Sequence, residues 1–396
     1  MSTDTEQIKQ KINSLRVAIV HDYLVQDGGA ERVFTALKKI FPSADIHVLI
    51  HNPKRTHSDF KDAKIKTAFL NNWPFAKRYY QWYLPLLPLA TEHLNFNGYD
   101  LILSSSSSFA KGIIVPATAK HICYLHTPTR FLWEDRIGYL ADLPQPALIR
   151  AVLPPLLHRL RGWDYQAAQR PDLILTNSVT SQIRIKRHYR RDSQVIHPPV
   201  DTHRIPLSRH EGTYWLTGGR LVPYKRFDLI VKAFNKLNMP LIIFGTGPEL
   251  KNLKKLASKK TKFVGQINDT EKTKLYRYSS GFIHPQIEDF GITAIEAMSA
   301  GRPVIAYGKG GASETILPGI TGTFIDMQTW EDIGDAVIRH KKNNFDPVSI
   351  RKHAETFSHQ NFENKLLESL SRFLNLSTQE SDELALLESA YAAYLN

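Results

Sequence analysis

The amino-acid sequence predicts an α/β protein with two parallel-sheet halves. Short apolar runs rich in β-branched residues alternate with helical patterns along the chain, which is typical of βαβ units. The alternation restarts after a proline-rich stretch at residues 200–208. A chain of 396 residues is also long enough for two domains of ordinary size. We therefore expect two Rossmann-like domains that meet in this stretch.

The expected strands follow from the apolar runs in chain order. In the first half they are Arg16–His21, Ile46–Ile50, Asp100–Ser104, His121–His126, Leu173–Asn177 and Gln194–His197. In the second half they are Tyr214–Thr217, Leu241–Phe244, Thr261–Val264, Gly281–His284, Pro303–Tyr307 and Gly322–Ile325. Neither half has a G-x-G-x-x-G pattern after its first strand, so ordinary dinucleotide binding is disfavoured.

Composition narrows the class of protein. The formal net charge of +13 favours an acidic partner, which could be a nucleic acid, an anionic membrane or a phosphorylated substrate. Basic residues cluster at 184–191 and 251–262 without a nucleic-acid-binding fingerprint, so we expect no nucleic acid partner and interpret both clusters first as solvated helix faces. The single cysteine, Cys123, excludes an internal disulfide and fits a reducing cytosol.

The first half of the chain contains one stretch, residues 73–89, that could contact a membrane. Residues 1–11 are polar, so we expect no signal peptide, and no run approaches the ~18 apolar residues that span a bilayer. Residues 73–89 mix aromatic residues, leucines and prolines beside Lys77 and Arg78, and the prolines exclude a long regular helix. This stretch suits either interfacial or acceptor binding, or simple packing under a long loop.

A pair of carboxylates marks the second half. Residues 292–298 predict a helix that ends at Ala300-Gly301, with Glu288 in the loop before it and Glu296 about one turn inside it. The helix N-terminus suits a phosphate, and Gly291 allows close approach of a ligand to the backbone. The two acids could therefore accept hydrogen bonds from the two ends of a sugar nucleotide. The alternative is that both acids are solvated.

Further polar residues follow the expected strands, where open α/β sheets bind ligands. Arg220 and Lys225 come after Gly218-Gly219 and could hold phosphate oxygens, unless they are ordinary surface charges. Gly28-Gly29 opens a helix after the first strand, and His126 ends the fourth. A lone histidine at a strand end is more often structural, so His126 alone does not identify a site.

These motifs, in this order, resemble the retaining glycosyltransferases of family four. The similarity runs from about Val17 to Ile325, and its most specific part is the segment from Glu288 through Glu296 with the continuation Gly-Arg-Pro-Val-Ile-Ala. The resemblance implies the GT-B fold, in which two Rossmann-like domains face each other across a cleft. Residues 131–133 and 80–112 resemble bacterial mannosyltransferases of surface-polysaccharide assembly.

The resemblance also implies roles for individual residues. Arg220 and Lys225 would hold the pyrophosphate, Glu296 the ribose and Glu288 the donor sugar, while His126 would hydrogen-bond the sugar near the reaction centre. The implied catalytic residues are His126, Arg220, Lys225 and Glu288. The implied donor-binding residues are Gly28, Gly29, Gly219, Arg220, Lys225, Gly265, Glu288, Phe290, Gly291, Ile292 and Glu296. The turn at 308–311 is more glycine-rich and basic than this family suggests, which leaves the role of Lys309 open.

We therefore expect a metal-independent, cofactor-free hexosyltransferase. The favoured donor is GDP-mannose, and the expected acceptor is a glycan or a polyprenyl-diphosphate-linked sugar, used in the cytoplasm or at the inner face of the plasma membrane. The expected domains are an acceptor-binding domain at 1–204, a nucleotide-sugar-binding domain at 205–357, and C-terminal helices at 358–396 that cross back onto the first domain. The alternatives are a GT-B sugar-nucleotide epimerase or hydrolase, and a non-catalytic, membrane-associated sugar-nucleotide-binding protein.

Overall fold

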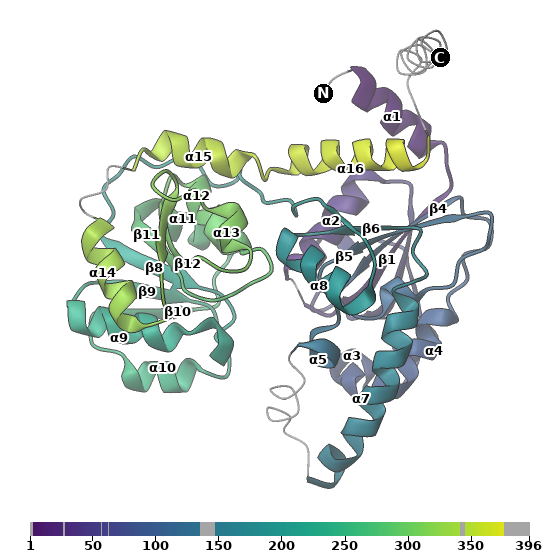
Figure 1. The fold of residues 1–396 in the computed structure, drawn as a ribbon, viewed down its shortest axis with the longest axis horizontal. Coiled ribbons are helices and arrows are strands. Elements are labelled where there is room, and N and C mark those ends of the chain that lie inside the picture. Colours follow the sequence, from purple (N-terminus) through teal and green to yellow (C-terminus); the bar gives the residue numbers. More distant parts are fainter. Residues whose placement is uncertain are drawn as a thin grey trace, which may run out of the picture. The chain divides into compact units, whose positions relative to one another are not determined.

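The computed structural model describes residues 3–26, 28–56, 58–61, 63–134, 147–340 and 345–375. The chain divides into two compact units (Figure 1). Unit 1 comprises Met1–Asn177, Ser181–Ile196 and Phe362–Asn396, and unit 2 comprises Ser178–Thr180 and His197–Asn361. The functional division into an acceptor-binding and a nucleotide-sugar-binding domain stays a prediction, and residues 376–396 lie outside the described residues.

The described residues of unit 1 form a parallel seven-stranded sheet in the order β3-β2-β1-β4-β5-β6-β7. The strands are β1 Val17–Leu24, β2 Asp45–His51, β3 Ile65–Thr67, β4 Leu101–Ser106, β5 Lys120–Leu125, β6 Leu173–Thr176 and β7 Gln194–Val195. The α-helices are α1 Thr3–Asn13, α2 Gly29–Ile40, α3 Ala76–Tyr79, α4 Leu87–Glu92, α5 Arg130–Trp133, α7 Ala147–Ala167 and α8 Val179–Tyr189. Short 3₁₀ helices are η1 Ser58–Phe60, η2 Phe69–Asn72, η3 Tyr80–Leu86 and η4 Ala110–Gly112.

The described residues of unit 2 form a parallel six-stranded sheet in the order β10-β9-β8-β11-β12-β13. The strands are β8 Tyr214–Gly218, β9 Leu241–Phe244, β10 Thr261–Gly265, β11 Ser279–His284, β12 Val304–Tyr307 and β13 Gly322–Ile325. The helices are η5 Pro223–Lys225, α9 Phe227–Leu237, α10 Leu250–Leu256, α11 Asp269–Tyr278, α12 Ile292–Ser299, α13 Ala312–Thr315, α14 Trp330–His340 and α15 Pro347–Glu355.

Each sheet is covered on both faces because successive strand residues alternate between two cores. In unit 2, Leu216 and Phe282 pack with α12 and α15, whereas their neighbours Trp215 and Ile283 pack with α9 and α14. Strands with both faces buried are near-continuous apolar runs, as the sequence showed. The predicted doubly covered α/β fold is therefore confirmed in both units.

The helix α16 (His359–Phe373) contributes apolar residues to the core of unit 1. Its residues Phe362, Leu366 and Leu370 are buried in one cluster with residues of α2 and of strands β1 and β4. Lys9 of α1 pairs with Glu363 of α16 at 2.7 Å. The end of the described chain is therefore part of the fold of unit 1, far in sequence from the strands that it covers.

Every expected strand is present, and the sequence analysis missed β3 alone among the described strands. This strand has three residues, lies at the sheet edge and is not fully buried, so it leaves no apolar run in the sequence. Residues 73–89 form the short helices α3, η3 and α4, with Pro85 inside η3 and Pro88 in the first turn of α4, so the predicted absence of a long regular helix is confirmed. None of the described helices combines the length and the apolar character needed to cross a bilayer.

Candidate functional site

Three loops of unit 2 meet at the carboxyl ends of strands β8, β9 and β10. The Gly219 amide donates to the Phe244 carbonyl at 3.1 Å, and the Gly245 amide donates to the Gly265 carbonyl at 2.6 Å. A side chain at Gly245 would place its Cβ 1.8 Å from the Gly219 carbonyl oxygen, so this close approach requires glycine. The predicted donor-binding glycines Gly219 and Gly265 thus lie at the same edge of one sheet.

Lys225 and Glu288 form an ion pair beside this edge. The Lys225 Nζ lies 2.7 Å from the Glu288 Oε1, and the two side chains are 13% and 18% exposed. The lysine ends η5 after β8, and a Cβ on Gly219 would lie 3.2 Å from its Nζ. The structure therefore brings Gly219, Lys225 and Glu288 together. The interpretation of Glu288 as a solvated loop residue is wrong.

Glu288 is held as a carboxylate. Burial opposes its ionisation, but interactions with His284 and Lys225 and a hydrogen bond from Gln286 outweigh burial and hold its pKa below the ordinary value. A permanent negative charge at this position can accept hydrogen bonds from hydroxyl groups of a ligand. Its pairing with Lys225 also means that any anion bound by the lysine must compete with Glu288.

The N-terminus of helix α12 follows directly. Gly291 precedes the helix with φ +92°, a left-handed conformation that favours glycine, and Ile292 begins it. The buried ring of Phe290 stacks on His197 with ring centroids 5.4 Å apart, which anchors the loop that carries Glu288. The predicted helix and its stop at Ala300-Gly301 are both confirmed.

Glu296 points from α12 to helix α11. The Lys272 Nζ lies 2.7 Å from its Oε1, the Tyr276 hydroxyl donates to its Oε2 at 2.9 Å, and the residue is 4% exposed. Glu296 is thus no solvated surface residue. A carboxylate can also accept a hydrogen bond from a hydroxyl group of a ligand.

The glycine-rich turn at residues 308–311 packs against the loop that carries Glu288. The Gly311 amide donates to the Glu288 carbonyl at 2.7 Å. A Cβ on Gly310 would lie 2.5 Å from that carbonyl oxygen, and a Cβ on Gly311 would lie 2.3 Å from the Phe290 Cα. Glycine is therefore needed here for close packing. The Lys309 Nζ lies 5.4 Å from the centroid of the Tyr307 ring.

Arg220 directly follows Gly219 and is exposed, so its guanidinium is accessible to a ligand. Among the residues that the structure describes, we find no group of three or more His, Cys, Asp or Glu side chains that could hold a metal ion. Lys225 and Glu288 are thus in contact at this edge, and Arg220 follows Gly219 at the same end of β8.

In unit 1, His126 directly follows strand β5 and its ring is buried. Its Nε2 lies 2.9 Å from the Ser105 hydroxyl, which also lies 3.2 Å from the Nδ1 of His21. Burial, with a smaller effect of His21, lowers the pKa of His126 to about 3. His126 is therefore neutral near pH 7 and can serve as a hydrogen-bonding group, whereas an imidazolium acid is excluded.

Gly28 and Gly29 begin helix α2 against a buried acid. The Glu31 Oε2 accepts the Gly28 amide at 2.9 Å, and a Cβ on Gly28 would lie 2.8 Å from that oxygen. Burial raises the pKa of Glu31. The sequence analysis missed Glu31, although its position three residues after the residue that caps the helix is a recognisable signal.

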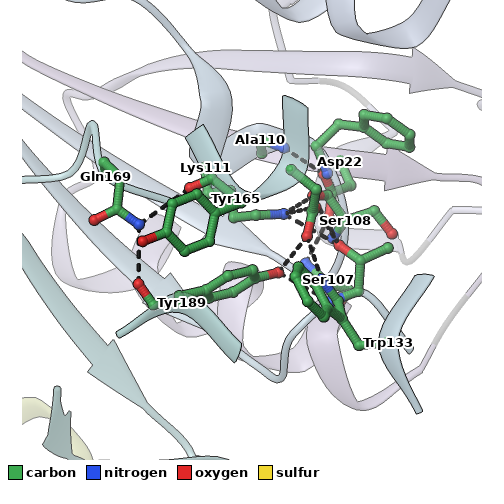
Figure 2. Close-up of polar contacts among 12 residues, drawn as sticks. Asp22, Ser107, Ser108, Ala110, Lys111, Trp133, Tyr165, Gln169 and Tyr189 are labelled. Atoms are coloured by element: carbon green, nitrogen blue, oxygen red, sulfur yellow. Dashed lines mark hydrogen bonds and ion pairs between the residues drawn. The ribbon is translucent and has the colours of Figure 1, made fainter. Parts of the chain in front are cut away.

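Two further acids, also missed, fix the loop after strand β4 (Figure 2). The Asp22 carboxylate accepts the backbone amides of Ser107, Ser108, Phe109 and Ala110 at 2.6–2.8 Å. Asp164 pairs with Lys111 at 2.6 Å, both side chains being 1% exposed, and accepts hydrogen bonds from Thr129, Trp133 and Tyr189. These partners are far apart in the sequence, so spacing gave no signal. Asp164 thereby links Lys111, which follows β4, to Thr129 and Trp133, which follow β5.

Comparison with known families matches both halves of the chain. Residues 27–204 match the family model described as "Glycosyltransferase Family 4", and residues 201–358 match the model described as "Glycosyl transferases group 1". Among curated proteins, D-inositol 3-phosphate glycosyltransferase of Mycobacterium tuberculosis is 31% identical over 172 residues. That match covers 39% of this chain and 36% of the relative, so the chain spans about a third of the length of this curated relative.

Solved structures show the same architecture over most of the chain. HepE of Anabaena in complex with UDP-glucose has a TM-score of 0.67 at 18% identity, covering 90% of this chain and 100% of that one. Sucrose-phosphate synthase of Thermosynechococcus elongatus has a TM-score of 0.66 at 15% identity, covering 91% and 100%. At these identities the likeness concerns the fold.

Proposed function

The chain belongs to glycosyltransferase family 4 and has the GT-B fold, and on that premise we propose that it moves a hexose from a nucleoside diphosphate sugar to a glycan or lipid-linked acceptor with retention of configuration. The observation that carries this proposal is the ion pair of Lys225 and Glu288 at Gly219, just before the N-terminus of α12. That arrangement offers a cation, backbone amides and a carboxylate to one small ligand.

Each part of a nucleotide sugar has a matching group in unit 2. Lys225, Arg220 and the amides at Gly291 and Ile292 suit the diphosphate, because cations and a helix N-terminus stabilise the negative charge that grows as the leaving group departs. Glu288 suits the hydroxyls of the sugar. Glu296 suits the ribose, and the backbone near Gly265 is the proposed place of the base.

We favour mannose, carried as GDP-mannose, because residues 131–133 and 80–112 resemble bacterial mannosyltransferases. Retention would follow from attack of the acceptor hydroxyl on the same face of the sugar. The bond from the anomeric carbon to the diphosphate breaks, the bond to the acceptor oxygen forms, and a diphosphate oxygen takes the acceptor proton. Gly28, Gly29 and His126 of unit 1 are proposed donor contacts, with neutral His126 as a hydrogen-bonding partner of the sugar.

The acceptor side of the proposal rests on exposed aromatic residues of unit 1. Phe75 and Trp82 are 69% and 60% exposed, Trp73 is also exposed, and the rings of Tyr79 and Trp82 stack at 4.7 Å. Phe75 has φ +58°, a strained conformation for a bulky residue that carries an exposed ring. With Lys77 and Arg78 exposed in the same segment, this surface suits an anionic membrane holding a polyprenyl-diphosphate-linked acceptor.

The same stretch also packs inward. Leu84 and Leu87 are buried in a core cluster that includes residues of α7. One face of the stretch therefore belongs to the core, and the other carries the exposed aromatic rings. Packing is confirmed for the buried residues of 73–89, and we propose membrane contact for the exposed ones alone.

The test is a product assay with GDP-mannose, UDP-glucose and ADP-glucose, each with and without a polyprenyl-diphosphate-linked acceptor. Transfer of the sugar to the acceptor with retained configuration supports the proposal. Free sugar or an epimerised nucleotide sugar formed equally without acceptor would favour the hydrolase or epimerase. Binding of nucleotides without any turnover would favour the non-catalytic alternative.

A further inference from the structure

His284 carries a buried ring nitrogen with no partner beside the candidate site. The residue ends strand β11 and is 1% exposed. Its Nδ1 lies 2.9 Å from the Gln286 Nε2, and its Nε2 lies 3.7 Å from the Glu288 Oε2, too far for a hydrogen bond. Among the described residues, the Nε2 has no hydrogen-bond partner. Buried polar atoms are rarely left in this state, so this nitrogen needs an explanation.

The hydrogen bonds around the ring define its tautomer. Gln286 bonds both the Nδ1 of His284 and the carboxylate of Glu288. Because a carboxylate can only accept, the amide NH₂ of Gln286 faces both groups, and the Nδ1 of His284 is an acceptor. Burial lowers the pKa of His284, so the ring is neutral and its single proton lies on Nε2. The orphan atom is therefore an N–H donor.

The position of that donor is fixed by Gly291. A Cβ on Gly291 would lie 3.1 Å from the Nε2 and 3.4 Å from the Cε1 of His284, so the ring edge lies against the backbone that precedes helix α12. The groups that interact electrostatically with His284 are Glu288 and Lys225. The Nε2–H is thus held between the Glu288 carboxylate and the start of α12.

The proposed function requires another hydrogen-bond donor for Glu288. In the structure, Lys225 neutralises Glu288, yet the proposed function requires the same lysine to hold the diphosphate. When the lysine turns to the diphosphate, a largely buried carboxylate loses its cation, which is strongly unfavourable unless other donors replace it. Among the described residues, Gln286 helps to lower the pKa of Glu288, and the Nε2–H of His284 lies 3.7 Å from the Glu288 Oε2.

We propose that His284 is a positioning residue that replaces Lys225 as the partner of Glu288 when the donor binds. As Lys225 moves to the diphosphate, the His284 Nε2–H closes from 3.7 Å to hydrogen-bond distance from the Glu288 carboxylate. This inference rests on the proposed function. Two changes then occur together: Lys225 binds the diphosphate, and His284 stabilises the Glu288 carboxylate that holds the sugar. The partner exchange makes diphosphate binding and the orientation of Glu288 depend on each other.

A double-mutant cycle with two probes, GDP and UDP, tests the exchange. The variants are His284→Asn, which keeps a polar group toward Gln286 and removes the Nε2–H, then Glu288→Gln, and both together. The dissociation constant of whichever nucleotide binds the wild type is measured for each. We expect His284→Asn to weaken binding about tenfold beside the charged Glu288, and less than about twofold in the Glu288→Gln background, where no charge needs replacement.

Three controls keep the outcome clear. His284→Gln places an amide N–H near the lost Nε2 and should recover most of the affinity, and His284→Phe replaces the Asn variant if the latter does not fold. His340→Gln changes another histidine with a lowered pKa in unit 2, outside the site, and should leave affinity unchanged. Equal weakening by His284→Asn in both backgrounds, or none in either, overturns the inference. Failure of wild type to bind either nucleotide instead overturns the proposed function.

Discussion

Replacing Lys225 with Ala should abolish most turnover while leaving the protein folded. The lysine is the cation nearest to Glu288, and its proposed task is to stabilise the departing diphosphate. Removing one preorganised group that meets developing charge reduces kcat roughly 10²–10³-fold. The structure adds a stability effect. The loss leaves Glu288 without its ion-pair partner, so we expect about 1–3 kcal/mol of destabilisation, moderated because both side chains keep some contact with water.

The double variant Lys225→Ala with Glu288→Gln separates these two effects. Neutralising Glu288 removes the unpaired charge, so the double variant should regain the lost stability, measured by denaturant unfolding, yet remain as slow as the single variant. Lys232→Ala, which removes an exposed lysine of helix α9 in the same unit, is the matched control and should behave as wild type. Wild-type turnover in purified, folded Lys225→Ala would refute the assignment of the leaving-group site.

Four further outcomes are expected. Arg220→Ala should reduce kcat about 10²-fold or more with little change in unfolding, because the exposed guanidinium serves the ligand; unchanged kcat contradicts this. Treatment with EDTA should leave activity largely intact, whereas complete loss reversed by magnesium or manganese would refute a metal-independent site. Replacing the exposed Trp82 with Ser should weaken sedimentation with anionic vesicles and raise the KM for a lipid-linked acceptor, while the donor KM stays near wild type. The reverse pattern refutes membrane contact. Burial lowers the pKa of His121 and of His126 to about 3, below the ordinary value of 6.5. Between these values the unfolded chain binds more protons than the folded one, so the free energy of unfolding should fall by ~1.4 kcal/mol per pH unit for each histidine as pH drops from about 6.5 toward 3. Unfolding curves measured at acid pH check this, and replacing His121 should reduce their dependence on pH.

The fold was predictable because its signals are local. A strand buried on both faces needs a continuous apolar run, and such runs marked every described strand except the three-residue β3. The glycine after α12 was predicted for the same reason, since Gly301 lies where the chain turns with a positive φ.

The candidate site was predictable only in part. Lys225 stood out because it follows a strand at the edge where parallel sheets bind ligands, and Glu288 because it precedes a helix N-terminus together with Glu296. Asp164 and Lys111 are 53 residues apart, and nothing in either segment indicates that they meet. His284 was not predicted from the sequence for another reason. A strand-end histidine is ordinary, and its importance comes from an unpaired nitrogen that depends on the positions of Gln286, Glu288 and Gly291 together.

The two carboxylates of unit 2 differ in what holds them, and the difference fits their proposed tasks. Glu296 is fixed by Lys272 and by the Tyr276 hydroxyl, both on helix α11, and it is nearly inaccessible to solvent. Neither partner is assigned to a ligand in the proposed reaction, so Glu296 keeps the same contacts before and after donor binding and can present a constant acceptor to the ribose. Glu288 is paired with Lys225, which must move to the diphosphate when the donor binds. Glu296 therefore offers a fixed acceptor for the nucleoside, while Glu288 becomes fully available to the sugar only when the diphosphate is already bound. The donor would then bind first through its nucleotide and afterwards through its sugar.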